Sequence, residues 1–334
     1  MNNSNLAFLF LFSFLFLQSS SFPDSQQILK NDKAAAENII FKSTDGGKTW
    51  QDISEGLPWN LKGEGVQTNQ FLPGVEAFGK DTRLYVCVGN GLYHSEANST
   101  ATFWKKEMFP DKMSSIAYGK AGIYAYNYGG QILQKTNGTN VWSPVYSNFK
   151  GSIRTVFETA GGTIFIGSEN GLFKSTNKGK TWKQVHAGGW VIKLVESNGV
   201  LLATSMSGII RSTDSGENWE LVICEGGVGI DVARIQGGFA AITFNTQSNT
   251  RRVRTSYDGG KTWQPIDAGL PASLSISSVI QVGKYLFCGH PGGIFRSSDK
   301  GKTWKLILPS IENKVFHVSV SGNVLYAIPG NGGC

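Results

Sequence analysis

The stretch RTSYDGGKTWQPI at residues 254–266 recurs along the chain, and this repetition decides the fold. Close copies are FKSTDGGKTWQDI at 41–53, FKSTNKGKTWKQV at 173–185, IRSTDSGENWELV at 210–222 and FRSSDKGKTWKLI at 295–307. In each copy a polar, glycine-rich centre separates two short runs that contain β-branched and aromatic residues. That pattern is typical of two strands joined by a tight turn.

The period of the repeat predicts the architecture. Two weaker copies, HSEANSTATFW ending at Trp104 and QKTNGTNVW ending at Trp142, fill the gap between the first and second clear copies. Successive repeat tryptophans then lie 37 to 54 residues apart. A period near 40 residues with four short apolar runs per unit favours a β-propeller. We therefore predict an all-β chain with a single seven-bladed propeller of four-stranded antiparallel blades. Six blades remains the alternative if one weaker copy is an insertion.

The two ends of the repeat array complement each other. The C-terminal segment VFHVSVSGNVLYAIPGNGG at 315–333 is the first half of a repeat, and NIIFKSTDGGKTWQDI at 38–53 is the second half. Pairing of the N- and C-terminal strands would complete one blade and remove the exposed sheet edges of an open array.

Each residue of the turn has a structural role. The acid can accept hydrogen bonds within its own turn, glycine provides a positive φ, and tryptophan offers a large surface to bury. Catalysis would require a partner group, yet these acids occur one per blade, so we expect a structural turn. Its residues are Ser43, Asp45, Gly47, Trp50, Ser175, Gly179, Trp182, Ser212, Asp214, Gly216, Trp219, Ser256, Asp258, Gly260, Trp263, Ser297, Asp299, Gly301 and Trp304, with Asn177 in place of one acid.

This motif resembles the Asp-box, or BNR repeat, of the sialidase-like propeller superfamily. The resemblance extends from residue 38 to the C-terminus and indicates fold rather than function. Members include sialidases, xyloglucanases, sortilin-type receptors and photosystem II assembly-factor propellers. Sialidases carry an arginine triad and an Arg-Ile-Pro motif before the first box, whereas the first arginine here, Arg83, follows that box. We therefore assign no catalytic residue from sialidases.

The xyloglucanase type is closer in blade number but uses acids from two tandem propellers, and this chain predicts one. A glycosidase needs two carboxyl groups that flank one bond. Glu64, Glu225 and Asp231 are the candidate carboxylates, and none forms a convincing pair. A glycoside hydrolase of sialidase-like or xyloglucanase-like type is thus the alternative to a non-catalytic role. An assembly factor like the photosystem propellers is a third, weaker reading. We expect no cofactor and no metal.

Binding residues are expected on one face of the propeller. The turns from the first to the second strand and from the third to the fourth lie on the face with the boxes. The connections between blades and the second-to-third loops lie on the opposite, variable face, where specificity usually resides. Tryptophan there can stack on a sugar or anchor a protein contact, or pack under its own loop. The candidate ligand-binding residues are Trp59, Trp190, Arg251, Arg252, His290 and Asn170. We expect a glycan or protein ligand.

Composition and the N-terminus suggest location. Residues 1–21 contain a 12-residue apolar run at 6–17 and predict a cleaved signal peptide. Residues 22–37 read as a linker, and 38–334 as the propeller. We therefore expect a secreted or extracellular protein (periplasmic in a Gram-negative bacterium), monomeric and without a transmembrane segment. The net charge of +7 favours an anionic ligand, and no motif indicates nucleic acid. Asn98 and Asn137 are glycosylation sequons if the source is eukaryotic.

The four cysteines follow no metal-binding spacing. Cys87 and Cys288 occupy similar places in two repeats, and we expect them to be small buried hydrophobic residues. The sequence leaves the redox state of Cys224 and Cys334 open.

Overall fold

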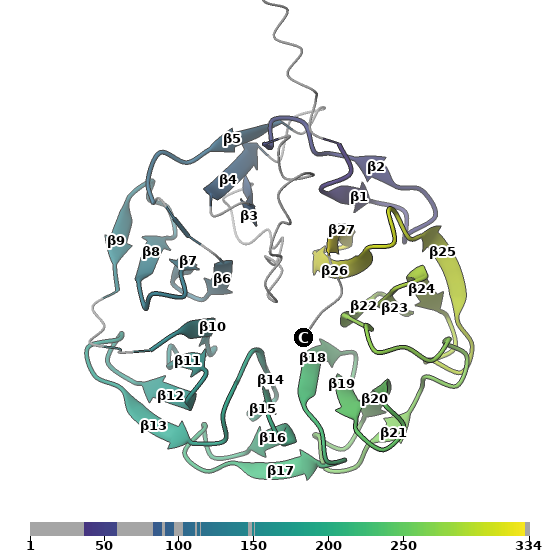
Figure 1. The fold of residues 1–334 in the computed structure, drawn as a ribbon. Helices are drawn as coiled ribbons and strands as arrows, with labels where there is room; N and C mark the ends of the chain where they lie inside the picture. The colour runs from purple at the N-terminus through teal and green to yellow at the C-terminus, as the bar shows by residue number, and fades with distance from the viewer. Residues whose placement is uncertain are drawn as a thin grey trace, which may run out of the picture. The chain divides into compact units, whose positions relative to one another are not determined.

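Seven antiparallel sheets form a ring, as Figure 1 shows. The computed structural model describes residues 37–58, 83–88, 91–96, 103–110, 112–113, 115–145, 149 and 151–330. No helix is assigned within these residues. Each sheet is one blade, with the strand at one end of the sheet near the centre of the ring and the strand at the other end at the rim. The chain is a seven-bladed β-propeller, so the alternative of six blades is wrong.

Five blades consist of four consecutive strands each, paired in chain order. They are numbered here III to VII. The strands are β6 (Ser115–Gly119), β7 (Gly122–Tyr126), β8 (Ile132–Thr136) and β9 (Trp142–Pro144) in blade III; β10 (Ile153–Glu158), β11 (Ile164–Ser168), β12 (Gly171–Ser175) and β13 (Lys183–His186) in blade IV; β14 (Leu194–Ser197), β15 (Val200–Ser205), β16 (Gly208–Ser212) and β17 (Glu220–Ile223) in blade V; β18 (Gly229–Ile235), β19 (Gly238–Asn245), β20 (Thr250–Ser256) and β21 (Gln264–Pro265) in blade VI; and β22 (Ser278–Val282), β23 (Tyr285–His290), β24 (Gly293–Ser297) and β25 (Lys305–Pro309) in blade VII.

Blade I closes the ring with strands from both ends of the repeat array. From the centre of the ring to the rim, its strands are β26 (Val315–Ser321), β27 (Val324–Gly330), β1 (Phe41–Ser43) and β2 (Gln51–Asp52). Phe41 pairs with Ala327 across the antiparallel junction. The predicted closure by terminal strands is confirmed.

Blade II contributes three strands to the described part of the chain: β3 (Arg83–Val88), β4 (Gly91–Glu96) and β5 (Trp104–Lys106). Residues 59–82, between β2 and β3, lie outside the described residues.

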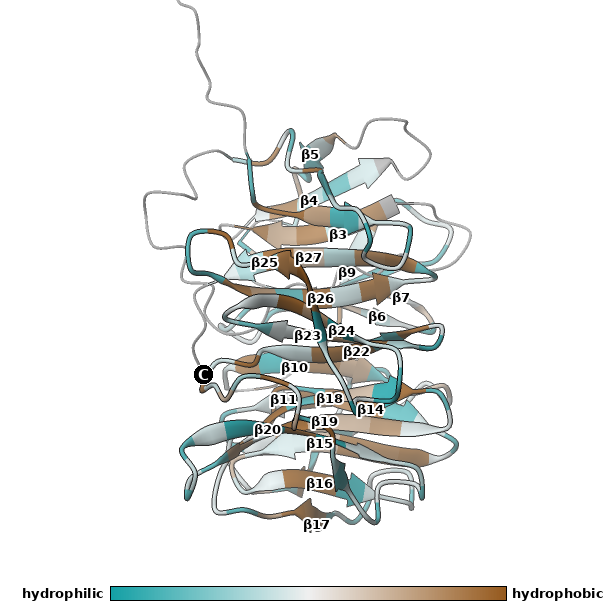
Figure 2. Ribbon diagram, turned by 90° about the vertical axis from the view of Figure 1, so that its right-hand side faces the viewer, coloured by the Kyte–Doolittle hydropathy of each residue, from teal (hydrophilic) through white to brown (hydrophobic). Residues whose placement is uncertain are grey.

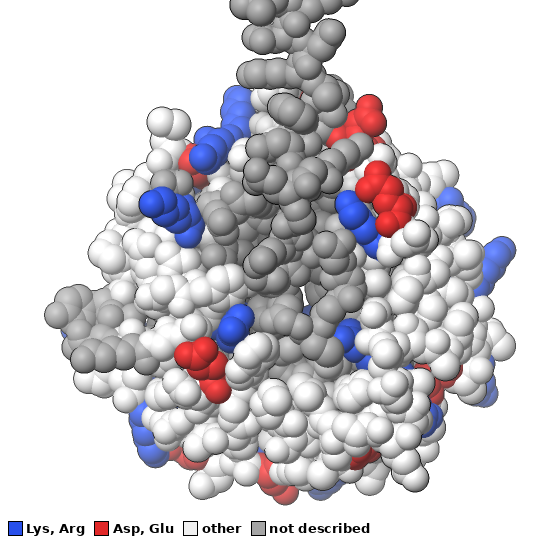
Figure 3. Space-filling view, viewed as in Figure 1, with Lys and Arg blue, Asp and Glu red and all other residues white. Residues whose placement is uncertain are grey.

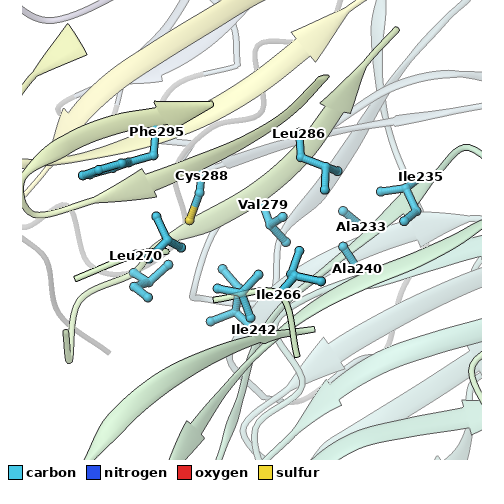
Figure 4. Close-up of a cluster of buried hydrophobic side chains, with 12 residues drawn as sticks. Ala233, Ile235, Ala240, Ile242, Ile266, Leu270, Val279, Leu286, Cys288 and Phe295 are labelled. Atoms are coloured by element: carbon cyan, nitrogen blue, oxygen red, sulfur yellow. The ribbon is translucent and has the colours of Figure 1, made fainter. Parts of the chain in front are cut away.

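The core lies between neighbouring blades. Figure 2 shows the blades from the side, with hydrophobic residues along the strands and hydrophilic residues more common in the turns. Seven buried apolar clusters join the sheets, and the one in Figure 4 combines Ile242 and Val253 of blade VI with Val279 and Leu286 of blade VII. Trp304 packs against this cluster, and its Nε1 donates a hydrogen bond to Ile266 O at 2.7 Å. Burial of this apolar surface between adjacent sheets is the main force that holds the ring together.

Candidate functional site

The clear box turns hold themselves together by hydrogen bonds. In blade VI, Ser256 Oγ donates to Asp258 Oδ1 at 2.8 Å, Gly260 N donates to Ser256 Oγ at 2.9 Å, and Thr262 Oγ1 donates to Asp258 Oδ2 at 2.6 Å. The turns of blades I, V and VII repeat this network. In blade IV, Asn177 Oδ1 accepts from Ser175 Oγ at 3.0 Å instead. These carboxylates already accept several hydrogen bonds inside their own turns.

The same bonds lower the pKa values of the box acids. Donation from the Thr303 hydroxyl, and then from its backbone N–H, lowers the pKa of Asp299 to about 2. The pKa values of Asp45, Asp214 and Asp258 are lowered by the same kind of contact. A carboxylate that is held ionised in this way is a poor proton donor at neutral pH. The geometry therefore assigns these acids to turn structure.

The sequence predicted one left-handed residue in each clear box turn, and the structure has two. Both the box glycine and the residue before it have positive φ, for example 72° at Gly46 and 79° at Gly47. In three turns the first of these left-handed residues is not glycine but Lys178, Ser215 or Lys300. The second position has a steric requirement too, because a Cβ at Gly47 would lie 2.5 Å from Cδ1 of Ile307 in the preceding blade.

In three blades, the basic residue that precedes the box serine donates a hydrogen bond to the box turn of the next blade. Lys174 Nζ donates to Ser215 O at 2.8 Å, and Arg211 Nε donates to Gly259 O at 2.7 Å. Arg296 NH1 donates to Gly46 O at 2.9 Å across the closure of the ring. Sequence reasoning missed these contacts, although the basic residue recurs at the same place in the repeat.

The opposite face shows a different use of polar side chains. Figure 3 looks onto this variable face, where most described atoms belong to uncharged residues and the charged side chains are scattered. Arg251 is 4% exposed, and its NH1 donates to Ile276 O at 2.7 Å. Arg252 Nε donates to Asp267 Oδ2 at 2.6 Å. Both candidate arginines lie on this face, and both bind groups of the protein itself.

His290 and Asn170 also lie in second-to-third loops. His290 is 4% exposed; its Nε2 lies 2.9 Å from Pro271 O, and its Nδ1 accepts from Gly292 N at 2.9 Å. Burial lowers the pKa of this imidazole, so it is neutral at physiological pH. Asn170 is exposed, and its backbone O accepts from Gln184 Nε2 at 2.8 Å. Asn170 is therefore accessible, whereas His290 serves its own loop.

Trp190 is presented to solvent by the short connection between β13 and β14. Its side chain is 37% exposed, while the next residue, Val191, is fully buried and donates from its N–H to Ser168 O at 3.0 Å. Gly189 has a φ of 77°, and a Cβ there would lie 2.8 Å from Cγ of Met206, whose side chain is 46% exposed. A buried anchor on one side and a left-handed glycine on the other fix the tryptophan at the surface.

Arg154 and Tyr128 complete this group, and sequence reasoning named neither. The Arg154 guanidinium carbon lies 4.5 Å from the Trp190 ring centroid and 5.0 Å from the Tyr128 ring centroid. Tyr128 belongs to the β7–β8 turn, so the three residues come from blades III and IV and the connection to blade V. Burial raises the pKa of Tyr128, and the positive charge of Arg154 opposes this. We call Tyr128, Arg154, Trp190 and Met206 the Trp190 patch.

Two carboxylates considered for catalysis are held in ion pairs. Asp231 Oδ1 lies 2.6 Å from Lys193 Nζ, its other oxygen accepts from Val279 N at 2.9 Å, and its side chain is 2% exposed. Glu225 pairs with Arg254 and accepts from Asn245 Nδ2 at 3.2 Å. Glu64, the third candidate, lies outside the described residues.

The remaining predicted residues divide into described and undescribed positions. Trp59, Asn98 and Cys334 lie outside the described residues. Asn137 is exposed, and its Nδ2 donates to Lys120 O at 3.0 Å. Cys87 and Cys288 are buried thiols with strongly raised pKa values caused by that burial, as expected of small hydrophobic residues, and Cys224 is an exposed thiol.

Within the described residues, no group of three or more His, Cys, Asp or Glu side chains is arranged to hold a metal ion. Over the same ranges the structure has no helix with the length and hydropathy needed to cross a membrane. The predicted signal peptide and linker fall almost entirely within residues 1–36, which are not described.

Comparison with known proteins supports the repeat and the fold. The BNR-Asp box repeat matches residues 294–307, and the BNR/Asp-box repeat matches residues 41–52 and 254–265. A search of curated proteins found no match.

Several solved structures share the fold at low identity. The GH74 xyloglucanase from Xanthomonas campestris is 14% identical with a TM-score of 0.61, and the match covers 81% of this chain but only 51% of that enzyme. YCF48 from Cyanidioschyzon merolae is 13% identical with a TM-score of 0.53, over 77% of this chain and 97% of YCF48. Virginiamycin B lyase from Staphylococcus aureus is 12% identical with a TM-score of 0.60, and the match covers 79% of this chain and 97% of the lyase. Such likeness concerns the fold alone, and hydrolases, lyases and YCF48 all use it. The chain is thus a seven-bladed β-propeller that carries BNR/Asp-box repeats.

Proposed function

We propose that this protein is a secreted, non-catalytic binding propeller that recognises a protein partner through the Trp190 patch on its variable face. The observation that carries the proposal is Trp190, a large aromatic side chain that is 37% exposed and held by a short, anchored connection. Exposed aromatic residues on fixed loops are frequent anchors of binding energy.

The composition of the patch favours a protein over a glycan. Tryptophan, tyrosine, methionine and arginine are the residue types enriched at protein–protein interfaces. Met206 beside Gly189 adds a flexible apolar surface that suits a peptide side chain. A propeller of this fold, YCF48, has been solved with a D1 peptide bound, at 14% identity to this chain. The fold is therefore compatible with peptide ligands, although this likeness assigns no ligand here.

A hydrolase has less support. Hydrolysis of a glycosidic bond needs two accessible carboxyl groups. Asp231 is buried in an ion pair with Lys193, and Glu225 is paired with Arg254. These pairings favour a structural role for both acids and leave binding as the function that the variable face supports best.

Peptide display on the purified protein tests the proposal. Clones that bind the wild type would be measured against Trp190→Ala and against Tyr257→Ala, a matched control. Tyr257 is also an exposed aromatic residue (50%) and also contacts a cation, Lys300, but it lies in a box turn on the opposite face. We expect Trp190→Ala to weaken binding at least tenfold and Tyr257→Ala to change it less than twofold, because only Trp190 lies in the patch.

Two results would overturn the proposal. One is that no peptide is enriched while a glycan array shows selective binding that Trp190→Ala abolishes. The other is enrichment of peptides that bind both variants equally. Release of reducing sugar from a β-glucan by the purified protein would favour the hydrolase.

A further inference from the structure

Arg154 sits at an irregular point in the innermost strand of blade IV. In the pairing of β10 with β11, Ile153 lies opposite Ser168 and Thr155 lies opposite Gly167, so Arg154 is the extra residue of a β-bulge. A bulge changes the direction of a side chain relative to the regular alternation. Here it lies at the end of β10 that meets the variable face.

The contacts of Arg154 differ from those of the other arginines nearby. Arg251, Arg252 and Arg254 each donate hydrogen bonds to a carbonyl, a carboxylate or a hydroxyl group of the protein. Among the described residues, the Arg154 guanidinium has no hydrogen-bond or ion-pair partner, and its Nε is buried without one. Its described contacts are the Tyr128 and Trp190 rings.

Ring contacts hold a guanidinium without using its donors. The rings of Trp190 and Tyr128 attract the cation through their π faces and restrict its orientation. The N–H groups lie in the guanidinium plane, and those of the two terminal nitrogens, unlike the buried Nε–H, stay available for a ligand. Arginine presents these donors as a planar fork that matches the two oxygens of a carboxylate. An unpaired, pre-oriented fork beside an exposed tryptophan therefore has the chemistry of a carboxylate receptor.

We infer that Arg154 binds a carboxylate of the partner, and that the partner presents an acidic peptide segment whose neighbouring side chain packs on Trp190 and Met206. This inference rests on the proposed function, because it names the chemistry recognised by the same patch. A peptide is favoured over an acidic sugar because Met206, which lies beside Gly189 and is 46% exposed, adds an apolar side chain to the patch.

The first experiment uses peptides enriched by display, each compared with its isostere in which Asp and Glu are replaced by Asn and Gln. We expect the isosteric change to weaken binding to the wild type about tenfold, which is the range of a charge-assisted hydrogen bond. The same change should have less than a twofold effect on Arg154→Gln, since the receptor is then absent. Arg154→Lys keeps the charge but loses the fork, so an intermediate loss is expected.

A matched control separates this site from net charge. Arg234 is exposed on β18, next to the first-to-second turn on the box face, and its side chain makes no hydrogen bond among the described residues. Arg234→Gln removes the same charge and should leave peptide binding unchanged. Peptides that depend on Trp190 but not on their carboxylates would overturn the inference and leave the proposed function standing.

A second measurement needs no selected peptide. The buried Nε–H of Arg154 should give a protected side-chain signal in ¹⁵N NMR spectra, identified by its loss in Arg154→Lys. N-acetylglutamate, glucuronate and chloride would be titrated at constant ionic strength. A saturable shift that is largest with N-acetylglutamate supports the inference. A larger response to glucuronate would point to an acidic glycan and overturn the peptide assignment, and no saturable shift would overturn the receptor itself.

Discussion

The two faces of the propeller use their polar side chains in opposite ways. On the box face, acids, serines and basic residues satisfy one another within a turn or across one blade boundary, as Ser256, Asp258 and Arg211 do. On the variable face most candidate residues are also engaged, but Arg154 keeps its donors while two rings hold it in place. The contrast separates a face that contributes stability from a patch that is available for recognition.

The largest expected effect is steric and lies on the box face. Gly47→Ala would place a Cβ 2.5 Å from Ile307 Cδ1 at a φ of 79°. We expect this change to lower the free energy of unfolding by about 2–3 kcal/mol, because the Ile307 methyl must move, the buried Phe287 ring would lie 3.1 Å from the new Cβ, and the backbone is strained. Gly46→Ala is the matched control, because its φ is 72° but no atom lies within 4 Å. It should cost about 1 kcal/mol in urea unfolding. Equal losses would show that packing against the preceding blade is unimportant.

Ser256→Ala tests the hydrogen bonds of the turn. The serine is 1% exposed, and its removal leaves the Gly260 N–H without its acceptor. The cost should be about 1–3 kcal/mol in denaturant unfolding, the penalty of an unpaired buried donor. A change below 0.5 kcal/mol, roughly the scatter of surface substitutions, would mean that the turn is held by its neighbours instead.

The contact between blades should contribute less. Arg211→Met removes the bond to Gly259 O and the ion pair with Glu220 but keeps much of the aliphatic packing. We expect a loss of about 1 kcal/mol, because water can reach the exposed turn and replace the donor. Arg234→Met, at an exposed position, should change stability by less than about 0.5 kcal/mol. Thermal unfolding of both variants beside the wild type would measure the difference, and similar effects would argue against a specific contact.

Acid should weaken the contributions of His317 and of a box acid to stability in different pH ranges. On β26, burial and then the charge of Lys193 lower the pKa of His317 to about 3, below the usual value near 6.5. The contribution of the neutral imidazole to the free energy of unfolding is complete above pH 6.5 and decreases as the pH falls toward 3. The pKa of Asp299 is lowered to about 2, so its contribution is complete above about pH 4 and is lost as the pH falls through 2. Urea unfolding from pH 7 to 2 would measure this. His317→Gln should reduce the pH dependence of the unfolding free energy in the first range, and Asp299→Asn should reduce it in the second.

The smallest effect on stability should come from a substitution in the Trp190 patch. Trp190→Ala removes a half-exposed ring and its contact with Arg154, so the unfolding free energy should fall by less than about 1 kcal/mol. Loss of binding without loss of stability would sharpen the contrast between the faces. A loss above 2 kcal/mol in the same unfolding assay would instead assign the ring to the core.

The sequence alone predicted the features that depend on nearby residues. The box turns join residues four positions apart, as in the Gly260 N–H bond to Ser256 Oγ, so one short pattern contains both partners. Repetition of that pattern predicted seven blades, and the two half-repeats predicted the closure seen at Phe41 and Ala327. Burial of Cys87 and Cys288 followed from their places in apolar strands.

The tertiary structure decided which variable-face side chains are accessible. Sequence position suggested Arg251 and His290, but both are buried and contact carbonyl groups of the connection between blades VI and VII. No sequence pattern indicated Arg154 or Tyr128, because the contacts of Arg154 with Tyr128 and Trp190 join blades III and IV and the connection to blade V. A repeat pattern records what each blade needs to fold. The side chains that meet between blades depend on the bulge in β10 and on how neighbouring sheets pack, and neither is encoded in a local pattern.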